Sequence, residues 1–169
     1  MAHKPGFQPT KVETHTYIFP DAVASQTRPS GYPTSWGGEP SADYGMNTQI
    51  TRSRQYAVRL QRGLRDIPTL SVTGERDDFF GANGIYVDTQ NRNLEAPVSA
   101  EYFHPDPASD GVNIEEGFQI DCGCKLQGGA SRNPGSSIKH SLSLRFRDLY
   151  GPGKLNYPVF EGTDITTFD

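Results

Sequence analysis

The sequence predicts an α+β fold in which an antiparallel, β-rich sheet packs against one amphipathic helix. The composition, with 18 glycines, 13 prolines, 8 tyrosines and 9 phenylalanines, is typical of short strands joined by many turns. Several segments alternate apolar and polar residues with the period of two that strands require. One segment, residues 48–67, instead carries apolar residues at helical spacing.

The predicted helix covers residues 48–67. Its apolar residues lie three or four positions apart and would share one face: Ala57, Leu60, Leu64 and Ile67. Pro68 ends the helix, because a proline ring disfavours the helical conformation in the preceding residue.

The sheet is predicted between about residues 68 and 160. In the segment 118–127, one face collects the apolar side chains Phe118, Ile120, Cys122, Cys124 and Leu126. We interpret the two cysteines as buried thiols in a core strand. Residues 139–147 alternate in the same way, which makes His140 a core histidine. Short strands are also expected at 69–72, 85–87 and 98–103, and a helical turn at 77–81.

The N-terminal part is expected to lie outside the sheet. Residues 12–19 alternate as a strand does, but no earlier segment is available to pair with it. We therefore interpret residues 1–19 as the remnant of a β-sandwich module, whose orphan strand would offer an edge for a homodimer. Residues 20–47, rich in proline, glycine, serine and tyrosine, are interpreted as an irregular but ordered strap. The chain is expected to be a fragment, with the remainder of its own polypeptide as a partner.

Charge and hydropathy exclude several classes of protein. The net charge of −4 argues against nucleic-acid binding, because no basic surface is available to neutralise phosphates. No apolar run is long enough to cross a membrane. The first residues lack the apolar core of a signal peptide, and no metal-ligand pattern is present.

Ten short motifs, in order along the chain, carry a resemblance to a known family. They are Thr16-Tyr17-Ile18-Phe19, Trp36-Gly37-Gly38, Asp43-Tyr44-Gly45-Met46, Ile67-Pro68-Thr69-Leu70-Ser71, Asn83-Gly84-Ile85-Tyr86-Val87, Pro97-Val98-Ser99-Ala100-Glu101, Gly117-Phe118-Gln119-Ile120, Gly128-Gly129-Ala130-Ser131-Arg132, Lys139-His140-Ser141 and Tyr150-Gly151-Pro152-Gly153-Lys154-Leu155. With these motifs, residues 17–169 resemble the N-terminal half of the spore-coat CotH kinase-like family in its bacterial multidomain form. The first 19 residues also resemble the end of a chitobiase C-terminal-like β-sandwich.

The resemblance implies a secreted or cell-surface protein of which residues 48–169 form a kinase N-lobe-like part. It implies a nucleotide site in which a glycine-rich turn approaches the phosphates of ATP and Lys139 pairs with them. The turn residues expected to contribute are Gly128, Gly129, Ser131 and Arg132. ATP and Mg²⁺ are expected as cofactors of the parent protein. The chain alone is expected to be inactive, because it has no H-R-D motif and we assign it no catalytic residue. The alternative interpretation of the glycine-rich turn is a plain hairpin loop without a ligand.

Two functions of other classes stay open at this stage. A noncatalytic carbohydrate-binding or structural module of an extracellular polysaccharide-degrading protein would use Tyr32, Trp36 and Tyr44 as an aromatic platform. The interpretation we favour for these aromatics is that they pin the strap to the sheet. A small hydrolase with an unrecognised site is the third possibility, although no G-x-S-x-G motif is present.

Overall fold

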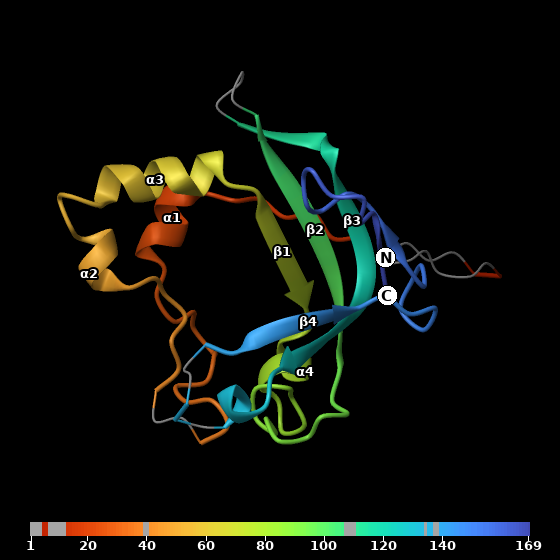
Figure 1. Ribbon diagram of the computed structural model, residues 1–169. Helices are drawn as coiled ribbons and strands as arrows, with labels where there is room; N and C mark the ends of the chain where they lie inside the picture. Colours follow the sequence, from red (N-terminus) through yellow and green to blue (C-terminus); the bar gives the residue numbers. More distant parts are fainter. Residues whose placement is uncertain (1–4, 7–12, 39–40, 107–110, 134, 137–138) are drawn as a thin grey trace.

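The computed structural model of the protein describes residues 5–6, 13–38, 41–106, 111–133, 135–136 and 139–169 (Figure 1). A four-stranded antiparallel sheet, in the order β1-β2-β3-β4, curls into a half-barrel. Its strands are β1 (Thr69–Gly74), β2 (Ala96–Asp106), β3 (Gly111–Gln127) and β4 (Ser141–Arg145). A small second sheet pairs β5 (Leu155–Asn156) with β6 (Thr167–Phe168).

Short helices accompany the sheet, and the predicted α+β class is confirmed. They are α1 (Pro20–Ser25), α2 (Thr48–Thr51), α3 (Ala57–Asp66), α4 (Arg76–Phe80) and the 3₁₀ turn η1 (Ala130–Arg132). Figure 1 shows α1, α2 and α3 gathered beside the β1 edge of the sheet. The turn predicted at 77–81 is α4, and Gly81 caps its C-terminus.

One face of the sheet carries the hydrophobic core. Cross-strand partners such as Val72, Ala100 and Ile120 lie in register on this face. The alternation in the segment 118–127 is confirmed, because Ile120, Cys122, Cys124 and Leu126 are all buried in the core. Both cysteines are free thiols with fully buried side chains, as predicted.

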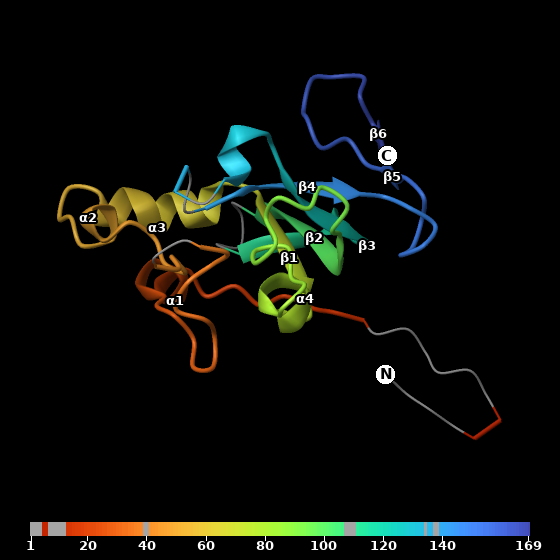
Figure 2. The same ribbon diagram turned by 90° about the horizontal axis from the view of Figure 1, so that it is seen from below.

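The opposite face of the sheet is polar. Ser71, Glu101 and Gln119 form one row across three strands, and Thr73, Ser99 and Asp121 form the next. Residues 13–19 run over this face as an extended segment, whereas β5 and β6 lie on the other side of the sheet (Figures 1 and 2).

The strand expected at 12–19 is therefore wrong for its described residues, 13–19, which have extended backbone but pair with no strand. Their alternation has another cause. Thr14, Thr16 and Ile18 are half-buried while the residues between them are exposed. The Thr16 hydroxyl donates to Glu101 Oε2, and Gln119 Nε2 donates to the Thr14 carbonyl oxygen. A single extended segment on a sheet surface thus produces the same period of two as a strand.

The single helix expected over 48–67 is also wrong. The segment instead forms two helices, α2 and α3, which are separated by residues 52–56. Ser53 explains the break, because its hydroxyl accepts a hydrogen bond from the Gln55 amide at 3.3 Å and favours a local turn. Ile67 lies past the end of α3 and is exposed, so the apolar face ends at Leu64.

The strand expected at 85–87 is a loop that returns along α4. The Ile85 amide donates to the Asp78 carbonyl oxygen at 3.0 Å, and the Tyr86 amide donates to that of Phe79 at 3.0 Å. Ile85 is buried in the core all the same. Its apolar character reflects packing under the sheet and not membership of a strand.

Candidate functional site

The glycine-rich turn follows directly from the end of β3. Gly128 has φ of +119°, a conformation that favours glycine, and space around Gly129 is open. The carbonyl oxygen of Ser131 accepts a hydrogen bond from His140 Nδ1 at 2.9 Å. This bond holds the turn against the residue that follows Lys139. The glycine-rich turn and Lys139, which were both expected to contribute to a nucleotide site, therefore lie at the same end of the β3–β4 pair.

Arg132 has a different environment from the rest of the turn. Only 5% of the residue is exposed, and its Nε donates a hydrogen bond to the Thr89 carbonyl oxygen at 2.9 Å. Gln90 Nε2 donates in turn to the Arg132 carbonyl oxygen at 3.2 Å. These contacts hold η1 against the loop between α4 and β2. The Nε of the Arg132 guanidinium therefore has a structural role.

Lys139 lies two residues before β4 and reaches the strap. Its Nζ donates to the Gly45 carbonyl oxygen and lies 3.5 Å from Asp43 Oδ2. About half of its side chain is exposed. The lysine is thus placed where the turn, the strap and β4 meet. His140 beside it is buried, as expected for a core histidine, and its ring lies 5.6 Å from that of Tyr86.

The three strap aromatics form one cluster with Phe80 and Tyr86. Trp36 is 5% exposed, lies parallel to Phe80 with ring centroids 6.0 Å apart, and donates its Nε1 proton to Tyr44 Oη at 3.0 Å. The Tyr44 hydroxyl donates to the Pro33 carbonyl oxygen at 2.9 Å. An indole this buried leaves little of its face exposed for a sugar ring, so this geometry supports the pinning interpretation. Tyr32, Trp36 and Tyr44 nevertheless line one pocket of about 400 Å³ beside Arg76.

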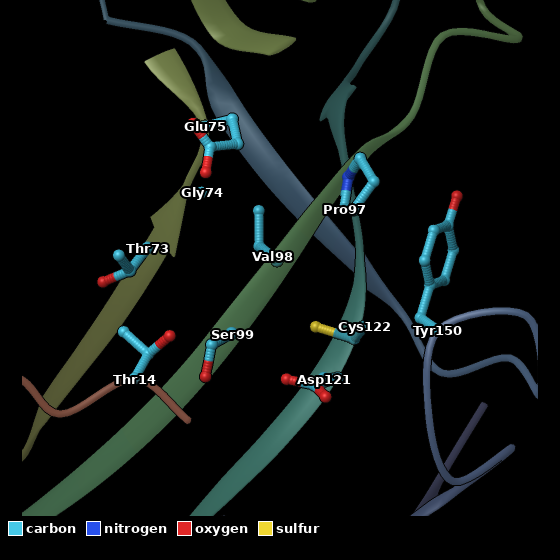
Figure 3. A pocket seen from close by; sticks show the side chains of 10 residues that line it. All are labelled: Thr14, Thr73, Gly74, Glu75, Pro97, Val98, Ser99, Asp121, Cys122 and Tyr150. Carbon is cyan, nitrogen blue, oxygen red and sulfur yellow. The ribbon is translucent and has the colours of Figure 1, made fainter. Parts of the chain in front are cut away.

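A second pocket, of about 410 Å³, opens on the polar face of the sheet. Figure 3 shows its floor on β2 and β3, formed by Pro97, Ser99 and Asp121. Thr14, Thr73 and Glu75 lie to one side and Tyr150 to the other. Five separate segments of the chain therefore build this pocket, which sequence reasoning missed. The only signal in the sequence was the polar alternation of β2 and β3.

Two polar groups near this pocket have unusual environments. The Ser99 hydroxyl is buried and has no hydrogen-bond partner among the described residues. Burial and a hydrogen bond to Glu95 raise the pKa of Tyr150 above its ordinary value.

Comparisons with protein-family models, with curated proteins and with solved structures found no match. Within the described ranges, no helix is both long and apolar enough to traverse a bilayer. The same part of the chain contains no group of three or more histidine, cysteine, aspartate and glutamate side chains arranged to hold a metal ion.

Proposed function

We propose that this chain is the N-terminal, N-lobe-like portion of a secreted CotH-type kinase-like protein and contributes part of its nucleotide site. The proposal rests on the sequence resemblance and on one structural observation. The hydrogen bond between Ser131 and His140 holds the glycine-rich turn beside the residue that follows Lys139.

The chemistry of the turn and of Lys139 suits phosphate. Gly129 has no Cβ atom and open space around it, so its backbone N–H group can approach an anion closely, whereas the corresponding space at Gly128 is filled by the Ser131 hydroxyl. Lys139 supplies a positive charge, which a bound phosphate would share with Asp43 or take over from it. Arg132 is assigned to the fold instead, because its Nε is bonded to the Thr89 carbonyl oxygen.

The remaining parts of a kinase site are expected elsewhere in the parent protein. Phosphoryl transfer needs carboxylate or amide ligands for Mg²⁺ and a group that positions the nucleophile. The chain is therefore expected to bind Mg-ATP without transferring its phosphoryl group.

A thermal melt of the purified chain with and without Mg-ATP tests the proposal. A ligand that binds only the folded state raises the melting temperature. At a ligand concentration of a hundred times its Kd, the free energy of unfolding rises by about 2.7 kcal/mol. We expect a shift with Mg-ATP, and none with Mg-AMP, which lacks the phosphates that Lys139 would contact.

Lys139→Ala should abolish the shift, whereas Lys154→Ala should retain it. Lys154 is a matched control because its exposed Nζ pairs with Asp169, in the C-terminal segment. The shift is measured for each variant relative to its own melting temperature without ligand. This is needed because Lys139→Ala loses the contacts to Gly45 and Asp43, which lowers its melting temperature. The absence of a shift in the cooperatively folded chain would overturn the proposal.

A further inference from the structure

The pocket on the polar face carries a charge that opposes nucleotide binding. Its charged lining residues are Glu75 and Asp121, and no lysine, arginine or histidine lines it among the described residues. A site with two carboxylates favours a cationic ligand and repels a phosphate. This pocket is therefore independent of the turn at Gly128, and its ligand belongs to another chemical class.

Four residues with hydroxyl groups also line the pocket. Thr14, Thr73, Ser99 and Tyr150 each contribute one. Ser99 is the informative member, because it is 7% exposed and its Oγ has no partner among the described residues. In Figure 3 this hydroxyl lies between Thr14 and Asp121. Buried polar groups are nearly always hydrogen-bonded, so an unpartnered one in a pocket wall marks a position for a ligand donor or acceptor.

The apolar part of the lining has a complementary shape. The ring of Tyr150 and the ring of Pro97 present flat apolar surfaces on the wall and floor of the pocket. Aromatic rings stack on the C–H faces of cyclic ligands while carboxylates and hydroxyls bind their edges. A volume of about 410 Å³ lies within the range of small-molecule sites.

From these features we infer that the pocket binds an amino sugar, that is, a pyranose with several hydroxyl groups and one primary ammonium group. Asp121, on the floor, binds the ammonium group, and Glu75, at one side of the pocket, accepts hydrogen bonds from sugar hydroxyls. Ser99 supplies a further hydrogen bond, and Tyr150 covers one face of the ring. The source is either a free monosaccharide or a unit of an oligomer, since both present the same groups.

An NMR titration of the isotopically labelled chain tests this inference with D-glucosamine as the probe. We expect saturable changes in amide shifts, centred on Ser99, Asp121 and Tyr150. D-Glucose keeps the hydroxyls but lacks the ammonium group, and cyclohexylamine has the amine without hydroxyls. Each should bind about tenfold more weakly, because each loses hydrogen bonds to charged or buried groups. A soluble glucosamine oligomer then shows whether the oligomer is the better ligand.

Two variants and one control localise the site. Asp121→Asn should weaken glucosamine binding about tenfold, whereas Asp66→Asn, on the exposed face of α3, should leave it unchanged. Ser99→Ala should weaken binding while the melting temperature holds or rises, since it removes a buried hydroxyl without a partner. If Ser99 had only a structural role, its substitution would lower the melting temperature and would not weaken binding on its own.

Shifts that do not saturate, that lie away from the pocket, or that persist unchanged in Asp121→Asn would overturn the inference. So would equal affinity for D-glucose and D-glucosamine, which would remove the role given to the carboxylates. None of these results depends on the outcome of the Mg-ATP melts, because the two sites use different residues.

Discussion

Arg132 shows how one residue type can serve either a ligand or the fold. Its position in the glycine-rich turn suggested a phosphate contact, since arginine forms strong hydrogen bonds to anions. The structure instead buries the residue and directs its Nε to the Thr89 carbonyl oxygen. Sequence cannot distinguish these roles, because the carbonyl group that accepts the bond belongs to a loop 43 residues away.

Arg132→Ala should therefore lower the free energy of unfolding by about 2–3 kcal/mol, the scale of a hydrogen bond to a charged group in a buried position. Urea denaturation measures this change. Arg62→Ala provides the control, because its ion pair with Asp66 on α3 is exposed and should contribute about 0.3–0.5 kcal/mol. Unchanged stability together with lost Mg-ATP binding would assign Arg132 to the nucleotide instead.

The two cysteines should be chemically inert in the folded chain. Burial raises the pKa of Cys122 to about 12, with Cys124, Asp121 and Glu95 adding to the effect, and burial with the Glu95 charge raises that of Cys124 to about 11. Only the thiolate reacts, so at pH 8 roughly one Cys124 in a thousand is reactive at any moment.

A thiol-specific chromogenic reagent should thus label no cysteine in the native protein at pH 8 and two after denaturation. The rate of any native labelling should rise about tenfold per pH unit up to the pKa values. Fast labelling at pH 8 would contradict the burial of these side chains.

Among the elements, the strap is held by its aromatic cluster. Trp36 stacks with Phe80 of α4, and its indole N–H is bonded to Tyr44, so one side chain joins two parts of the strap to α4. Burying such a ring contributes more than any other single contact of the segment.

Trp36→Ala should lower the free energy of unfolding by about 3–5 kcal/mol. Trp36→Phe should cost less, because it keeps the ring packing and loses the hydrogen bond to Tyr44. Acrylamide quenching gives a second measurement, since Trp36 is the only tryptophan. Its fluorescence should be poorly quenched in the native state and readily quenched in urea. Efficient native quenching would restore the aromatic platform as an explanation.

Sequence reasoning succeeded for elements whose two faces have different environments. In residues 118–127 of β3, every second side chain enters the core while the others face the polar side, so the alternation was visible. It failed where an apolar residue is buried without forming a strand, as at Ile85, and where Ser53 interrupts a helical pattern by a local hydrogen bond. The pocket on the polar face could not be predicted, because Thr14, Glu75 and Tyr150 meet only through the tertiary fold.

At the scale of the whole molecule, residues 13–19 connect three strands of the sheet. The Thr16 hydroxyl donates to Glu101, which is 6% exposed, and Ser71 Oγ lies 2.8 Å from the same hydroxyl. Gln119 on β3 reaches the Thr14 carbonyl oxygen. A buried carboxylate needs such a donor, so this segment is part of the folded unit and not a detached end.

Thr16→Val keeps the shape of the side chain and removes the donor to Glu101. We expect a loss of about 1.5–3 kcal/mol in the free energy of unfolding, since a charged acceptor is left unpaired in a buried position. Thr167→Val, which removes an exposed hydrogen bond to Asn156, should change it by less than about 0.5 kcal/mol. Equal stability of the two variants would show that Glu101 finds another partner.

The contacts of residues 13–19 also have a consequence for the order of events during synthesis. This segment leaves the ribosome before the sheet, yet its partners at Glu101 and Gln119 follow 85 and 105 residues later. Contacts between residues so far apart in the chain form slowly, because a long loop must close first. The polar face of the nascent sheet therefore stays uncovered until β3 has emerged, and residues 13–19 dock on it late in folding.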